Sequence, residues 1–259
     1  MTPSPAVTLR EAKHLEGGPR ELLPQKWILM KVQRLRVTFA RGEEVKYITH
    51  LDLMRFWERA LRRAGIPLAY SEGFSPSPRL ALAAPLPVGV TSSGELMDVY
   101  LARRVTPQHF IKAVSRQVPP GVAVLEVREV GLGLPSLQSQ VRWAEYQVDA
   151  PTDRSVEEVR RAVGDLLAAE SIPWQHQRER ELRRYDLRPL VQDVWVEALD
   201  DGRCALAMRL RADSQGSGRA EQVVAALGLE APARIHRRRL ILEEVSPAVQ
   251  SWRRSGQPE

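Results

Sequence analysis

Alternating hydrophobic and polar positions mark the first predicted strand, and a helical period follows it. In the stretch QRLRVTFARG, Leu35, Val37 and Phe39 alternate with polar neighbours, which is the period of a β-strand. From residue 50 the apolar positions recur every three or four residues, as on one face of an α-helix that Gly65 would end: Leu51, Met54, Trp57, Leu61 and Ala64. Strand patterns follow at 66–70, 79–84 and 94–102, then a helix at 106–119 with Thr106 as N-cap and Pro107 in its first turn, and a strand at 122–130.

The second half repeats this order of elements. A strand pattern at 141–150 precedes a helix at 155–170, where Ser155 and Glu158 have the spacing of a capping box. A strand-like segment at 173–181 follows, then a hairpin at 194–212 with Asp201-Gly202 in its turn, a helix at 219–229 and a strand at 233–245. The sequence therefore predicts an α+β protein with two tandem ferredoxin-like β-α-β-β-α-β units, at 31–132 and 141–246, each with its helices packed on an antiparallel sheet and joined by a linker at 133–140.

The two ends of the chain lack such periodicity. Residues 1–30 mix Pro, Gly, Glu and Arg, and residues 247–259 also show no repeat, so we predict a disordered leader and a disordered tail. The leader has no cationic segment followed by an apolar one, as a secretory signal would, and translation beginning at Met1 or at Met30 fits the sequence equally. No apolar run has the length of a membrane span, and we expect a cytoplasmic protein.

Composition narrows the chemistry. The 259 residues include 43% apolar residues, enough for a core, and only one cysteine, Cys204, in an alternating apolar run typical of a buried strand. One cysteine excludes an intrachain disulfide, a cysteine zinc site and an iron–sulfur cluster held by this chain, and we predict no metal and no cofactor. The formal net charge of +6 is compatible with a polyanionic partner.

Residues 70–90, YSEGFSPSPRLALAAPLPVGV, combine turn residues with large apolar side chains. Pro76, Pro78, Pro85 and Pro87 stiffen this segment, and Gly73 allows a bend before Phe74. One interpretation is that Phe74 and the leucines cover the core. The other is a rigid rim beside the first helix, with Phe74 and Arg79 in contact with RNA or a protein partner.

The first helix carries two groups of candidate residues. Thr49 and Asp52 have the spacing of an N-terminal cap, which explains both without a ligand, and His50 lies in the first turn. Opposite the apolar stripe, arginines recur at helical spacing, with one more beside them: Arg55, Arg59, Arg62 and Arg63. They form either a solvated helix face or a ridge that binds phosphates through planar, bidentate guanidinium groups.

A second basic stretch lies at 177–190. It contains Arg178, Arg180, Arg184, Tyr185 and Arg188, and arginines around an aromatic ring are typical of a surface that binds phosphates and stacks a base. Because arginine alternates with glutamate here, a salt-bridged edge strand is the alternative. Phosphate-binding loops, dinucleotide fingerprints, zinc-hydrolase motifs and nucleophile elbows are absent from the sequence.

The first half resembles a bacterial family of radical-SAM-associated proteins, whose module occurs alone or fused behind a radical SAM domain. The resemblance depends on residues 47–101 and is supported by RRYDLRPLV at 183–191. The positions that match the family motif are His50, Asp52, Glu72, Gly73, Pro76, Pro78, Glu95 and Asp186. The resemblance implies that the protein works beside a radical SAM protein on a separate chain, which would hold the cluster that this chain cannot.

Three functions follow as hypotheses. The first is a non-catalytic accessory protein that binds tRNA or rRNA, or presents another substrate, to the radical SAM partner. The second is a metal-independent endoribonuclease with His50 as general base. The third is a scaffold that docks the partner protein through the proline-rich segment and does not bind RNA.

Overall fold

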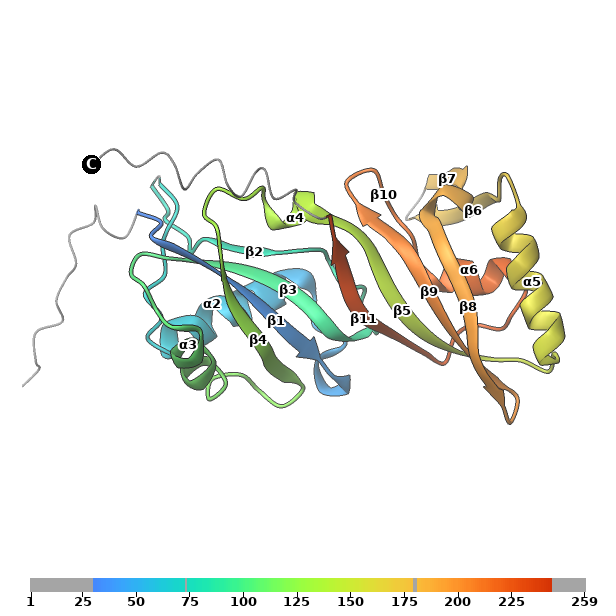
Figure 1. Ribbon diagram of the computed structural model, residues 1–259, viewed down its shortest axis with the longest axis horizontal. Coiled ribbons are helices and arrows are strands. Elements are labelled where there is room, and N and C mark those ends of the chain that lie inside the picture. The colour runs from blue at the N-terminus through green and yellow to red at the C-terminus, as the bar shows by residue number, and fades with distance from the viewer. Residues whose placement is uncertain (1–29, 73, 179–180, 244–259) are drawn as a thin grey trace, which may run out of the picture.

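The computed structural model describes residues 30–72, 74–178 and 181–243 (Figure 1). The predicted tail at 247–259 and the predicted leader up to residue 29 lie outside these ranges, as do Gly73 and Arg180. None of the helices in the described ranges combines the length and the apolar character that crossing a bilayer requires.

The first half contains four strands in the sheet order β4-β1-β3-β2, with all neighbours antiparallel. Its elements are β1 (Gln33–Arg41), the 3₁₀ turn η1 (Glu43–Val45), α2 (His50–Arg63), β2 (Leu80–Leu82), β3 (Thr91–Leu101), α3 (Pro107–Val114) and β4 (Val122–Val130). The segment at 66–70, predicted as a strand, makes only isolated bridges at Leu68 and Tyr70. Pro67 within the segment and Pro78 opposite Tyr70 explain this difference, because each lacks a backbone donor for the ladder.

The second half contains the strand order β8-β9-β5-β11, also antiparallel throughout. Its elements are α4 (Leu137–Gln140), β5 (Val141–Pro151), α5 (Val156–Ala168), β6 (Pro173–Arg178), β7 (Glu181–Asp186), η2 (Arg188–Leu190), β8 (Val191–Asp200), β9 (Arg203–Asp213), β10 (Gly216–Ser217), α6 (Ala220–Ala226) and β11 (Arg234–Leu242). The predicted strand at 173–181 is one arm of the β6–β7 hairpin, which forms a two-stranded sheet of its own.

A short parallel contact joins the two halves. His236 and Arg237 at the start of β11 pair with Thr91 and Ser92 at the start of β3. All strands except β6 and β7 therefore belong to one nine-stranded mixed sheet, and the fold is α+β, with five α-helices in the described ranges. The sequence predicted antiparallel sheets and gave no sign of this parallel contact, because two residue pairs leave no periodic pattern.

Two hydrophobic cores lie in the two halves. Trp57 of α2 packs edge-on against Phe39 of β1 in the first core, with ring centroids 5.0 Å apart. The second core, beneath β5, β8 and β9, includes buried Cys204, as predicted, and also takes Ala83, Leu86 and Val90 from the proline-rich segment. The end of that segment therefore belongs to the core of the second half, although it is part of the first half in sequence.

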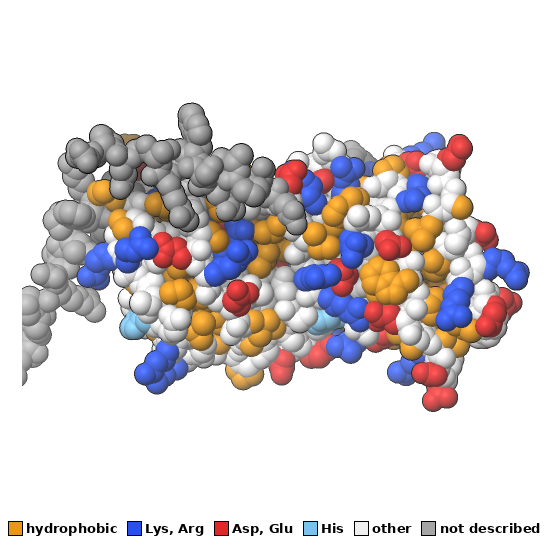
Figure 2. Space-filling view, viewed as in Figure 1, with side chains coloured by type: hydrophobic (Ala, Val, Ile, Leu, Met, Phe, Trp, Pro, Cys, Tyr) orange, Lys and Arg blue, Asp and Glu red, His pale blue; other side chains and the backbone are white. Residues whose placement is uncertain are grey.

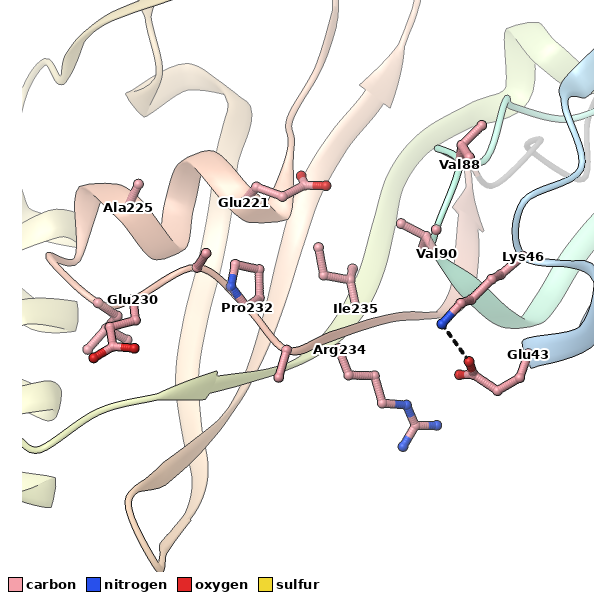
Figure 3. Close-up of a pocket in the computed structure, with 14 residues that line it drawn as sticks. Glu43, Lys46, Val88, Val90, Glu221, Ala225, Glu230, Pro232, Arg234 and Ile235 are labelled. Atoms are coloured by element: carbon pink, nitrogen blue, oxygen red, sulfur yellow. Dashed lines mark hydrogen bonds and ion pairs between the residues drawn. The ribbon is translucent and has the colours of Figure 1, made fainter.

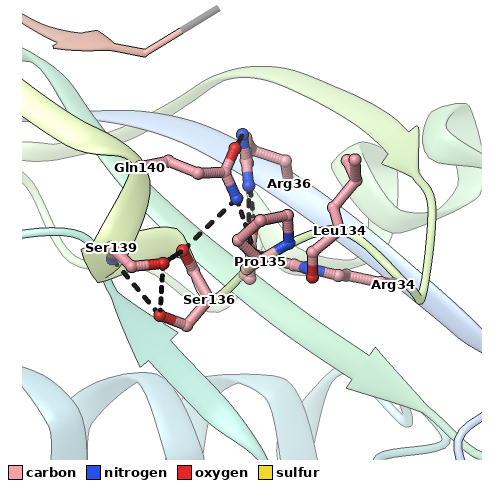
Figure 4. Close-up of polar contacts among 8 residues, drawn as sticks. Arg34, Arg36, Leu134, Pro135, Ser136, Ser139 and Gln140 are labelled. Carbon is pink, nitrogen blue, oxygen red and sulfur yellow. Dashed lines mark hydrogen bonds and ion pairs between the residues drawn. The ribbon is translucent and has the colours of Figure 1, made fainter. Parts of the chain in front are cut away.

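The predicted linker at 133–140 is attached to the sheet by a buried, ion-paired arginine. Arg34 and Arg36 of β1 both bind the carboxylate of Asp98, which is fully buried, at N–O distances from 2.5 to 3.1 Å. Arg34 also donates to the backbone carbonyls of Leu134 and Pro135, both at 2.9 Å (Figure 4). The segment before α4 is thus fixed to the sheet by charge-assisted hydrogen bonds.

Candidate nucleic-acid interface

Helix α2 presents a cationic face because its apolar positions lie on the opposite side. The backbone N–H of Asp52 donates to Thr49 Oγ1 at 3.2 Å, which confirms Thr49 as the N-cap. Leu53, Trp57 and Leu61 are buried, so arginines at the intervening positions face solvent: Arg55, Arg59, Arg62 and Arg63 are all exposed. Gly65 follows the helix with a φ of 68°, the left-handed conformation predicted for its end.

Helix α3 extends this cationic face. Arg63 at the end of α2 donates through Nη2 to the backbone carbonyl of Gln117, just beyond α3, at 3.0 Å. Lys112 and Arg116 are also exposed, and the only acidic residues in 50–63 and 107–117 are Asp52 and Glu58. We call this surface the cationic helical layer: Arg55, Arg59, Arg62, Arg63, Lys112 and Arg116. Sequence reasoning found the α2 arginines and missed the α3 cations, although their four-residue spacing was visible.

The sheet face of the second half has a different electrostatic character. Figure 2 shows basic and acidic side chains interspersed over β5, β8 and β9. Glu145 of β5 accepts from Arg209 at 3.3 Å and from Arg239 at 3.0 Å, and Arg238 pairs with Glu197 at 2.6 Å. These arginines are neutralised by carboxylates, whereas the described cations of the helical layer meet at most one weak pair, Arg55 with Asp52 at 3.5 Å. The cationic helical layer is therefore a stronger candidate than the sheet face for a site that binds a polyanion.

A loop with a hydrogen-bonded base lies beside the end of α2. The Ser71 N–H donates to the Ser77 carbonyl at 2.9 Å, and Arg79 Nε donates to the Tyr70 carbonyl at 3.0 Å, so the base of the loop is closed. The Arg62 guanidinium lies 5.8 Å from the centroid of the Tyr70 ring, which places this base against the cationic layer. Phe74 near the tip is fully exposed, at 110% of its reference area. The first interpretation of Phe74, as a core residue, is wrong.

The basic stretch of the second half does not join this surface. Figure 1 shows the β6–β7 hairpin and α2 in opposite halves of the elongated molecule. Arg184 is exposed, the side chain of Arg178 lies outside the described parts of the chain, and Tyr185 is half-buried with its hydroxyl 2.5 Å from Gln222 Oε1. Arg188 donates to the carbonyls of Val191 and Leu167 at 2.6 and 2.9 Å. The structure thus uses Tyr185 and Arg188, both predicted as ligand-binding residues, in internal contacts.

Some residues that match the family motif are exposed, and others are buried or bound to distant parts of the chain. His50 is exposed in the first turn of α2, and its imidazole has no hydrogen-bond partner in the described ranges, while Glu72 and Pro76 are exposed and Pro78 is buried. Glu95 is 3% exposed and binds Arg237 of β11 at 2.8 and 2.5 Å. Asp186 accepts from the backbone N–H groups of Ile172 and Arg188, and these bonds lower the pKa of its carboxyl. Glu95 and Asp186 therefore act structurally, and their distant partners were not visible in the sequence.

The fold and this site define an α+β protein whose first half presents a cationic helical layer. The chain belongs to the family described as "Uncharacterized protein conserved in bacteria (DUF2344)", whose model matches residues 34–220. A search of curated proteins found no match.

The chain also has distant likenesses among solved structures. The chain is similar to one in a Cbf5-Nop10-Gar1 complex, with a TM-score of 0.44 and 12% identity over 89% of this chain and 55% of that one. It is also similar to a chain of the archaeal box H/ACA sRNP Nop10-Cbf5 complex, with a TM-score of 0.41 and 11% identity over 85% of this chain and 51% of that one. The chain thus spans about half the length of these structures.

Proposed function

We propose that this protein is a non-catalytic RNA-binding accessory protein and that the cationic helical layer is its RNA interface. The observation that carries the proposal is the exposed run of arginines on α2, continued by the cations of α3, with few carboxylates nearby. Arginine forms bidentate, charge-assisted hydrogen bonds with phosphates, and such contacts supply most of the affinity of a non-specific nucleic-acid complex.

The geometry of α2 suits a short stretch of one strand. Arg55 and Arg62 are seven positions apart, which at 1.5 Å per residue is ~10 Å along the helix axis. This length allows the arginines to contact phosphates of a few consecutive nucleotides. Exposed Phe74, in the loop whose base meets Arg62 through Tyr70, offers a ring on which an unpaired base can stack, an interaction worth ~1–3 kcal/mol.

The partner is the second part of the proposal. The resemblance of residues 47–101 to radical-SAM-associated proteins supports a radical SAM protein as partner, and these 259 residues, with one cysteine, cannot themselves supply the ligands of that enzyme's cluster. In this view the accessory protein holds tRNA or rRNA and the partner modifies it. Two tandem ferredoxin-like units remain our interpretation of the strand orders in the two halves.

The test is RNA binding with a matched control. Fluorescence anisotropy would follow a labelled tRNA between about 50 and about 200 mM salt, where phosphate contacts weaken steeply. We expect Arg59→Glu/Arg62→Glu to abolish most binding. Arg160→Glu/Arg161→Glu, the same charge change on exposed positions of α5, should leave binding nearly intact.

Three results would contradict the proposal. They are no salt-sensitive binding to tRNA or total RNA, equal losses in the two double variants, and cleavage of the bound RNA. Cleavage that His50→Ala removes while binding persists would identify the endoribonuclease instead.

A further inference from the structure

A cleft lies at the seam between the two halves, separate from the cationic helical layer. It has a volume of about 540 Å³, within the usual range of ligand sites. One wall is Val88 to Val90 with Lys46, and the other is α6 with the segment that leads into β11 (Figure 3). Pro232 and Ile235 line its interior. No single half of the chain makes this cleft, so its lining could not be read from either half alone.

The rim of the cleft exposes large apolar side chains. Val88, which lines the cleft, is 58% exposed, and Tyr47, which lies beside Gly89 of the cleft wall, is 70% exposed. Gly89 holds Tyr47 close to the cleft wall, because its N–H donates to the carbonyl of Lys46 at 2.9 Å. Apolar area gathered around a concave surface is typical of a protein-binding site, since burying it releases water.

The charges of the cleft select the partner. Glu43 and Lys46 neutralise each other at 2.7 Å. The other charged residues of the cleft are two carboxylates, Glu221 and Glu230, and one cation, Arg234, so the lining has an excess of negative charge. Neither carboxylate has an ion-pair or hydrogen-bond partner in the described ranges. In Figure 3 the Glu221 side chain points from α6 toward Val88 and Val90. A carboxylate beside an apolar surface attracts a cation and repels the phosphates of RNA.

We propose that this seam cleft docks a polypeptide segment of a partner protein, one that carries apolar anchor side chains next to an arginine or lysine. The apolar anchor lies on Pro232 and Ile235 between Val88 and α6, and the cation pairs with Glu221. Lys46 lines the cleft and lies four positions before His50, where α2 begins, so the chain passes from the cleft directly into the helix that carries most of the cationic helical layer. The docking site is independent of whether that layer binds RNA.

The experiment uses the full chain and defined peptides in isothermal titration calorimetry. The probe is a short blocked peptide with leucines next to arginines. One comparison peptide has glutamate in place of arginine, and the other has serine in place of leucine. We expect the first peptide to bind about tenfold more tightly than either, a difference of ~1.4 kcal/mol. Val88→Glu should abolish its binding, and Glu221→Gln should weaken it several-fold.

Leu125→Glu on β4 is the matched control, because Leu125 is 51% exposed and does not line the cleft. It should bind the first peptide like the unaltered chain. The proposal is overturned if no peptide binds, if the glutamate peptide binds equally well, or if Val88→Glu binds normally while its circular dichroism is unchanged. Binding of spermidine with the same Glu221 dependence as the peptide, without any need for leucine, would indicate a site for small cations instead. The RNA assay separates the two proposals, because Val88→Glu should leave RNA binding unchanged and Arg59→Glu/Arg62→Glu should leave peptide binding unchanged.

Discussion

The ion pair between Glu95 of β3 and Arg237 of β11 joins the two halves, and Glu95→Gln tests how much this pair contributes to stability. Arg237 is 1% exposed and donates to both carboxylate oxygens of Glu95, at 2.8 and 2.5 Å. The same guanidinium donates to the carbonyls of Pro85 at 3.1 Å and Ala84 at 3.3 Å. Arg237 thus fixes the segment that continues to Val88 at the cleft, and the nearby Glu95 carboxylate raises its pKa against the opposing effect of burial.

The expected loss of unfolding free energy follows from the buried charge that Glu95→Gln leaves without a partner. A glutamine side chain has one acceptor oxygen where the carboxylate has two, so its NH₂ donor faces a guanidinium donor and the Arg237 charge stays buried without a counter-ion. Removing one partner of a buried pair costs ~3–5 kcal/mol of unfolding free energy. For a chain of this size each 1 kcal/mol lowers the melting temperature by ~2–4 °C, so we expect a decrease of ~6–20 °C.

Urea unfolding followed by circular dichroism measures this cost, with Glu197→Gln as the control. Glu197 pairs with Arg238, the neighbour of Arg237, but both side chains are about 30% exposed, and a surface pair contributes only ~0–1 kcal/mol. Arg237→Met and the double variant complete a cycle, in which we expect a coupling free energy of ~1–3 kcal/mol. Equal losses from Glu95→Gln and Glu197→Gln, or simple additivity in the cycle, would show that this pair does not hold the seam.

Three further predictions concern the same sheet. Gly94→Ala would place a Cβ 2.4 Å from the Arg238 carbonyl oxygen, so we expect it to cost ~1–3 kcal/mol in urea unfolding, whereas Gly164→Ala, with no atom within 4 Å, should not destabilise the chain. Asp98→Asn leaves two buried guanidinium groups without a carboxylate, so we expect a loss of ~3–5 kcal/mol and faster proteolysis at 131–140; an unchanged proteolysis rate would contradict the proposed clamp. Burial, together with Arg234 and Arg238, lowers the pKa of His236 below its ordinary 6.5, so the unfolded chain binds this proton at higher pH than the folded chain does. The unfolding free energy should therefore fall as the pH drops through 6.5, and His236→Gln should flatten that slope, which an unchanged pH profile would refute.

The helix cap, the hairpin turn and the exposed helix face could be predicted because each depends on residues that are close together in the sequence. Ser155 and Glu158 form the complete capping box that their spacing predicted, and Asp201 and Gly202 have the positive φ angles, 47° and 74°, of a tight hairpin turn. The arginines of α2 face solvent for the same reason, since the opposite face of that helix carries the apolar positions that the core buries. Each of these features depends on residues within a few positions of one another.

Partners distant in the sequence could not be predicted in this way. Arg34 and Arg36 alternate with the apolar residues of β1, and that pattern predicts a solvated face, yet both are buried with Asp98 more than sixty positions away. An alternating pattern indicates which side chains share a face, but it does not indicate what covers that face.

By itself, the sequence determined the long strands, the helices α2, α3, α5 and α6, the caps Thr49, Thr106 and Ser155, the single buried cysteine and the cationic face of α2. Only the tertiary structure decided that β11 pairs in parallel with β3, that Ala83, Leu86 and Val90 pack into the core of the second half, and that a cleft forms at the seam. The physical reason is that short-range periodicity specifies the conformation of a segment, whereas burial and ion pairing are fixed by whichever distant segment the folded chain brings against it.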